Sequence, residues 1–211
     1  MSDQSRTTAD RILAAARTRL LAEGYARMSV RKIADTAGVP MSQIQYHFGS
    51  KQGLVVALLE AEDRRLVTRQ RDLYSTDAPL WKRYEQACDL LDDDLASGYV
   101  RVLQEMIAAG WSNHELGAAV RELMDGWFAL LSEVARETER RHGPLGPFTV
   151  DEAATLIGSV FFGSEALLLL GFDRNALPIR SALRRIGVLI RQLEEGSPHG
   201  GTADARLPTE S

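Results

Sequence analysis

The segment that decides the fold runs from Ser29 to Lys51 and reads SVRKIADTAGVPMSQIQYHFGSK. Ser29 is a residue type that caps helix starts, because its hydroxyl accepts a backbone N–H. The residues behind it repeat at i, i+3, i+4 and i+7, which predicts one buried helical face made of Val30, Ile33, Ala34 and Ala37. Gly38 breaks this helix, and Pro40 suits the first turn of another. A capped helix, a glycine turn and a second short helix predict a helix-turn-helix.

The second helix of this unit has two different faces. Ile44 and Phe48 are four residues apart and are expected to pack inward on the first helix. The outward side then carries Met41, Ser42, Gln43 and Gln45. Amide and hydroxyl groups can pair with base edges in the major groove, and a methionine can touch a thymine methyl group. This side is therefore the predicted base-reading surface.

Residues at the exit of the second helix suit a different role. Tyr46, His47 and Lys51 present a phenol, an imidazole and an ammonium group near the start of the next helix, where phosphate oxygens bind readily. Arg31, just inside the first helix, can reach a base or a phosphate. An ordinary three-helix packing unit is the alternative interpretation of the whole segment.

The charge distribution favours the DNA-binding interpretation. Residues 1–51 hold eight Lys and Arg against four Asp and Glu, whereas the rest of the chain holds 17 against 25. A basic head on an acidic body suggests that only the head meets a polyanion.

Outside this segment, helical periodicity runs along nearly the whole chain, so we expect an all-α protein of about nine helices. Helices are expected at residues 8–23, 50–73, 79–96, 99–109, 113–141, 150–171 and 178–195, in addition to the two short ones. The predicted domains are a helix-turn-helix domain at 1–50, a larger helical body at 51–195 and a disordered tail at 196–211.

Composition excludes several classes of protein. The N-terminus has no apolar signal core, and no uninterrupted apolar run reaches the ~18–20 residues of a membrane helix. A lone cysteine, Cys88, allows no internal disulfide and makes a cysteine-based zinc site implausible. The chain also lacks zinc-protease, phosphate-loop and nucleophile-elbow motifs. We therefore expect a cytoplasmic bacterial protein that is not an enzyme and needs no metal or cofactor.

The N-terminal quarter resembles the DNA-binding domain of the TetR/AcrR family. The resemblance rests on the motifs ILAAA at 12–16, EGY at 23–25, SVRKIA at 29–34, AGV at 37–39 and YHFGSK at 46–51. It implies an all-helical homodimer that binds a near-palindromic operator and senses a small molecule. The implied DNA contacts are Ser29, Arg31, Met41, Ser42, Gln43, Gln45, Tyr46, His47 and Lys51. Gly53 stands where many relatives carry an acidic residue, which is expected to weaken the cap of the fourth helix.

The body is expected to hold an unidentified effector and a dimer interface. Aromatic, sulfur and acidic residues of its middle helices are the candidate ligand contacts: Tyr99, Glu105, Met106, Trp111, Met124, Trp127, Phe128, Phe161, Phe162 and Glu165. Each could instead be an ordinary core or surface residue. The last two helices supply the candidate dimer contacts Leu156, Val160, Gly163, Leu167, Leu183, Ile186 and Ile190. Asp92, Asp93 and Asp94 are most simply a solvated face.

Two other functions compete with a regulator. An enzyme would need a catalytic constellation that the motifs do not supply, and a helical scaffold would need neither a basic head nor an amide-bearing helix. Among regulators, repression is the default expectation, and activation remains an alternative.

Overall fold

A computed structural model describes residues 3–172 and 177–196 of the chain. This part forms nine helices and no sheet. The helices are α1 (Asp3–Arg27), α2 (Val30–Ala37), α3 (Met41–Phe48), α4 (Lys51–Tyr74), α5 (Leu80–Ser97), α6 (Tyr99–Gly110), α7 (His114–His142), α8 (Val150–Leu169) and α9 (Ile179–Gly196). The all-α prediction is confirmed. The tail was predicted at 196–211; Gly196 belongs to α9, and the rest of that segment lies outside the described residues.

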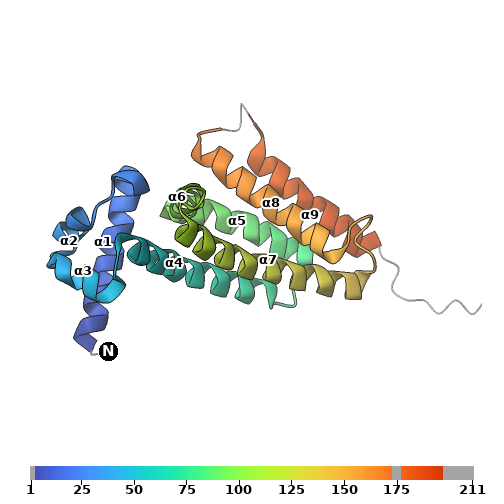
Figure 1. The fold of residues 1–211 in the computed structure, drawn as a ribbon. Coiled ribbons are helices and arrows are strands. Elements are labelled where there is room, and N and C mark those ends of the chain that lie inside the picture. Colours follow the sequence, from blue (N-terminus) through green and yellow to red (C-terminus); the bar gives the residue numbers. More distant parts are fainter. Residues whose placement is uncertain (1–2, 173–176, 197–211) are drawn as a thin grey trace, which may run out of the picture.

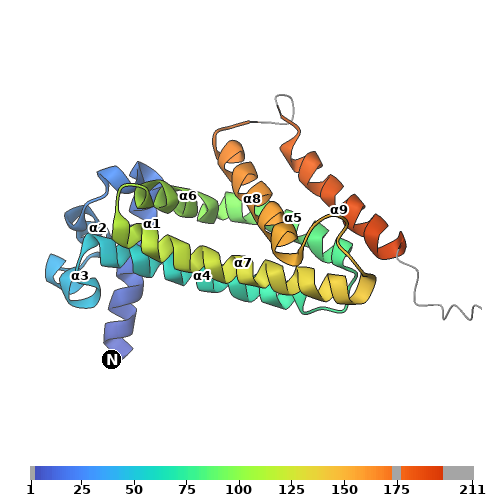
Figure 2. The ribbon, with the colours of Figure 1, turned by 45° about the vertical axis from the view of Figure 1, so that its right-hand side comes forward.

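The helices form a small head and an elongated body (Figure 1). Helices α1, α2 and α3 make the head, and α4 leads from it along the body beside α7. Helix α8 packs on α7, and α9 packs on α5, so these two helices cover one side of the body (Figure 2). Because α4 has 24 residues at 1.5 Å each, its two ends lie about 36 Å apart.

Most predicted helix boundaries agree with the structure to within two residues, but the first helix differs at both ends. It begins at Asp3, and it continues to Arg27 across a kink at Gly24, where we expected it to end. Gly24 has φ 75° and ψ 164°, a conformation that favours glycine, so the expected break in helical geometry is present. The turn after the kink carries Tyr25, which contacts the body.

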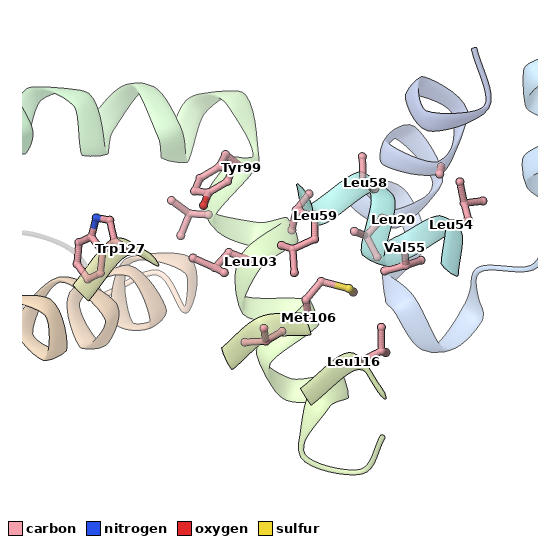
Figure 3. Packing of buried hydrophobic residues seen from close by; sticks show 14 of the residues in the cluster. Leu20, Leu54, Val55, Leu58, Leu59, Tyr99, Leu103, Met106, Leu116 and Trp127 are labelled. Atoms are coloured by element: carbon pink, nitrogen blue, oxygen red, sulfur yellow. The ribbon is translucent and has the colours of Figure 1, made fainter. Parts of the chain in front are cut away.

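One apolar core runs from the head into the body. Its head contains Ile12, Ile33 and Ile44, each no more than 1% exposed. Figure 3 shows how it continues: Leu20 of α1 lies beside Leu54 and Leu58 of α4, close to Met106 of α6. The head is therefore packed on the body by buried apolar contacts rather than joined by a free linker.

Helix α8 requires a correction to the sequence analysis. Val150–Leu169 is long and apolar enough, at a mean hydropathy of 1.4, to cross a membrane by length and composition, although we expected no such segment. We looked for an unbroken stretch of apolar residues, and in α8 small and polar residues stand between the apolar ones. Core helices of soluble proteins pass the same test, and α8 packs on α7 and carries the buried carboxyl of Glu165. Only 22% of its apolar window is buried inside the monomer, which leaves an apolar outer face.

The three consecutive aspartates are not simply a solvated face. Asp92 pairs with Arg180 of α9 at 2.7 Å, and Asp94 accepts two hydrogen bonds from Arg69 of α4 at 2.5 and 2.7 Å. Asp93 is exposed. Two of the three carboxylates therefore tie α5 to neighbouring helices.

Candidate DNA-binding surface and internal cavities

Local sequence signals build the head as expected. The Ser29 side chain accepts a hydrogen bond from Lys32 N at 3.4 Å and caps α2. Gly38 ends α2 in the left-handed conformation, with φ 63° and ψ 42°. Pro40 was expected in the first turn of α3. It is instead the N-cap, the residue directly before the first helical residue, Met41. These caps fix where α3 starts relative to α2.

Helix α3 separates buried from exposed residues as its spacing predicts. Ile44 is 1% exposed and Phe48 packs on the core, whereas Met41 is 54% and Tyr46 76% exposed. Ser42, Gln45 and Arg31 are exposed, and Gln43 and His47 are half-buried. Four of the candidate contacts on α3 are therefore exposed: Met41, Ser42, Gln45 and Tyr46.

Lys51 differs from the other candidates because its ammonium group already has partners. Its Nζ donates to Tyr25 O at 2.8 Å and lies 4.2 Å from the centre of the Tyr25 ring. Partial burial lowers the pKa of this ammonium group. Lys51 therefore also holds the start of α4 against the turn after the α1 kink.

Several basic residues of the head are likewise engaged inside the molecule. Arg11 donates to the Ala37 and Gly38 carbonyls at 2.6 and 3.2 Å, where it satisfies the end of α2. Lys32 pairs with Glu23 at 2.5 Å, and this pair lowers the pKa of Glu23. Arg17 and Arg19 also have partners. The +4 charge of the head is thus partly structural, while Arg27 and Arg31 are exposed and have no ion pair among the described residues.

Of the cavities in the body, two bear on the predicted ligand site. The inner cavity has a volume of about 30 Å³ and lies among α4, α5, α6, α7 and α8. Its lining residues are Leu66, Gln70, Ala87, Leu91, Asp94, Tyr99, Leu103, Leu123, Trp127, Phe161, Phe162 and Glu165. The far-end groove, of about 270 Å³, lies at the end of the body away from the head, between Tyr74 at the end of α4 and Leu193 of α9.

The inner cavity gathers half of the predicted ligand contacts. These are Tyr99, Trp127, Phe161, Phe162 and Glu165. Sequence reasoning missed Gln70 of α4 and Asp94 of α5, because the candidates were drawn from the later helices α6, α7 and α8.

The other predicted ligand contacts lie elsewhere. Glu105 accepts a hydrogen bond from Tyr25 N at 3.1 Å and so joins α6 to the head. Trp111 is 84% exposed after the end of α6, and Met106 is fully buried in the core. Met124 and Phe128 pack against the core without lining the inner cavity.

The polar groups of the inner cavity are unevenly satisfied. Trp127 Nε1 donates to Gln70 Oε1 at 2.6 Å, and Gln104 Nε2 donates to Glu165 Oε2 at 3.3 Å. The Tyr99 hydroxyl is buried without a hydrogen-bond partner. Burial raises the pKa of Glu165 to about 7, the Gln104 hydrogen bond lowers it in part, and the charge of Asp94 raises it further.

The far-end groove was not predicted as a site. It is lined almost entirely by apolar side chains, among which are Leu131, Leu145, Phe148 and Ile157. Long-range packing of the ends of α4, α5, α7, α8 and α9 creates it, and no local sequence motif marks it.

Comparison with known proteins gives a family model and a set of similar folds. Residues 12–58 match the model of bacterial regulatory proteins of the tetR family. No curated protein matches the chain by sequence. A TetR transcription regulator from Haloarcula marismortui has a TM-score of 0.72 at 17% identity, over 91% of this chain and 98% of that one.

Two similar structures contain small molecules. A protein from Saccharomonospora viridis, described as a transcriptional regulator in complex with choline, has a TM-score of 0.73 at 21% identity, over 89% of this chain and 96% of that one. FadR from Bacillus subtilis, in complex with stearoyl-CoA, has a TM-score of 0.67 at 20% identity, over 89% of this chain and 98% of that one. At these identities the likeness establishes the fold.

Proposed function

We propose that this chain, whose N-terminal domain is of the tetR family and whose fold is that of TetR-family regulators, is a cytoplasmic transcriptional repressor. Two copies would bind a near-palindromic operator through paired α3 helices, and a small molecule bound in the body would release them. The protein would have no enzymatic activity.

The single observation that carries this proposal is the surface of α3. An eight-residue helix anchored by buried Ile44 presents Met41, Ser42 and Gln45 outward, with Tyr46 near its end. Methionine, serine and glutamine side chains can contact base edges, and a tyrosine hydroxyl can bind a backbone phosphate. A merely structural helix-turn-helix would have no need for such an exposed set.

A dimer is supported by the apolar outer face of the last two helices. Leu156, Val188 and Leu189 are 47%, 51% and 63% exposed there. Exposed Ser159 and Gly163 would allow a partner helix to approach closely. Leu183, by contrast, is 2% exposed and packs within the monomer, so it is not part of the proposed interface. Two-fold symmetry would place two recognition helices one helical turn of DNA apart.

Coupling between the inner cavity and the head would run through the α5–α6 junction as well as α4. Arg17 of α1 pairs with Glu62 of α4 at 3.2 Å and donates to the Ser97 carbonyl at 2.5 Å. The Ser97 hydroxyl in turn accepts a hydrogen bond from Tyr99 N at 3.2 Å. A ligand that moved Tyr99 would therefore shift Ser97, and with it the hydrogen bond between Ser97 and Arg17 of α1. The ligands seen in two structural neighbours support the proposal that the body takes an effector.

The test is selection of bound fragments from the genomic DNA of the source organism, followed by footprinting. The proposal expects a protected, near-palindromic site beside a promoter, and expects Gln45→Ala to alter the preferred bases. Binding that ignored sequence, or no binding to DNA at all, would favour the scaffold interpretation. Turnover of a substrate would instead revive the enzyme interpretation.

A further inference from the structure

The inner cavity combines two carboxyl groups, that of Glu165 and that of Asp94, which is paired with Arg69, with an unpartnered phenol. Tyr99 is 5% exposed, lines this cavity, and its hydroxyl has no hydrogen-bond partner. Figure 3 shows Tyr99 reaching from α6 into the interior, with Trp127 beyond it along the core. Buried polar groups in proteins nearly always have a partner, so an empty acceptor in a cavity points to a ligand or water that fills it.

The charge around this cavity is predominantly negative. Burial raises the pKa of the Tyr99 phenol, and four nearby carboxylates raise it further: Asp63, Glu165, Asp94 and Glu62. Arg69 pairs with Asp94 and Arg17 with Glu62, which leaves Asp63 and Glu165 as the carboxyl groups of this set without a salt bridge among the described residues. The lining residues contain no Lys, Arg or His. An anion would therefore meet repulsion here, whereas a cation would be attracted.

Three aromatic rings complete the site. Trp127 and Phe162 are in edge-to-face contact, with ring centres 4.9 Å apart, and Phe161 lies in the same wall. Aromatic faces attract ammonium groups, and more strongly where water is excluded.

We infer that the inner cavity binds the protonated amino group of an organic amine. Glu165 would be its counter-ion, Tyr99 would accept a second N–H, and the aromatic wall would flank it. The inference deepens the proposed function, since it names the class of effector on which that function depends.

The size of the cavity selects among ammonium groups. A volume of about 30 Å³ admits a group the size of a water molecule, which needs ~10–15 Å³. A primary ammonium group is of that size, whereas a trimethylammonium group would have to displace the rings. Phe162 and Leu123 are half-buried, so the organic part of the ligand would extend past them toward solvent.

The experiment measures binding of hexylammonium to the full chain, without DNA, by calorimetry and by the change in tryptophan fluorescence, to which Trp81 and Trp111 also contribute. Hexanol, hexanoate and hexyltrimethylammonium are the comparison probes. We expect hexylammonium to bind best, and Glu165→Gln to weaken it about 10- to 100-fold, as expected for a lost charged hydrogen bond. Tyr99→Phe should weaken it less, and Glu133→Gln, at an exposed position on α7, should not change it.

A second readout does not depend on variants. Because the pKa of Glu165 is about 7 and a bound cation would lower it, binding at pH 7 should release about half a proton. Calorimetry in two buffers of different ionisation enthalpy measures that number.

Equal binding of hexanol or hexanoate, binding by hexyltrimethylammonium alone, no proton release, or no binding by any probe would each overturn the inference. Because the assay contains no DNA, its outcome is independent of operator binding. Failure of the amine inference can therefore be distinguished from failure of the proposed function.

Discussion

The buried carboxyl of Glu165 makes the stability of this protein depend on pH in a defined direction. Its pKa is about 7 in the folded protein against 4.5 for a solvent-exposed glutamate, with burial as the main cause. The folded state therefore holds a proton that the unfolded state has lost between these two values. The stabilising contribution is complete below pH 4.5 and disappears as the pH rises through about 7.

The size of the effect follows from the same two values. Raising the pH from 5 to 8 should lower the free energy of unfolding by about 2 to 3 kcal/mol through this group alone. Glu165→Gln keeps the shape and the acceptor for Gln104 but removes the ionisation. The variant should therefore become relatively more stable than the wild type as the pH rises.

Urea unfolding of both proteins at one protein concentration, at pH 5, 6, 7 and 8, measures this difference. Asp63, whose pKa is also raised, is present in both proteins and cancels in the comparison. Parallel stability profiles for the wild type and the variant would refute the reasoning, because they would mean that Glu165 ionises normally in the folded protein.

Five further substitutions, one of them a control, test the packing and the proposed surfaces. Gly53→Ala should lower the free energy of unfolding by ~1–3 kcal/mol in urea, because its Cβ would lie 2.2 Å from a backbone carbonyl of α3. The control is Gly126→Ala, where the added Cβ would meet no atom within 4 Å, and it should raise the free energy of unfolding by ~0.5–1 kcal/mol. A loss of stability equal to that of Gly53→Ala would contradict this account. Leu189→Arg should shift the protein from dimer to monomer in sedimentation, and an unchanged dimer would remove α9 from the interface. Tyr46→Ala should weaken binding to all DNA sequences in a gel-shift titration, whereas Gln45→Ala should change base preference; identical effects would contradict the assigned roles.

The head could be predicted from sequence because its signals are local. Each signal acts within one or two helical turns. The structure has the cap at Ser29, the helix end at Gly38 and the buried position of Ile33 as expected. The same holds for the cap of α4, where Ser50 accepts from Gly53 N at 2.9 Å despite the absent acidic residue. The boundaries of the body helices were predictable for the same reason.

Features that depend on long-range packing could not be predicted. The charge of Arg11 and Arg17 was visible, but not that Arg11 ties α1 to α2 and Arg17 ties α1 to the body. Glu105 looked like a ligand anchor because nothing in the sequence places it against Tyr25 of α1. Tyr99 and Glu165 stood out as polar groups in apolar helices, yet their meeting in one cavity depends on the packing of α6 against α8.

The most direct test of the central claim, that paired α3 helices bind DNA, is selection from a random duplex library with the full-length protein. The account predicts an enriched near-palindrome whose half-sites are separated by about one helical turn or a multiple of it. It also predicts that Gln45→Ala changes the enriched bases without changing the half-site spacing. A library with no enriched sequence, or with an asymmetric site bound by a single copy, would contradict the account.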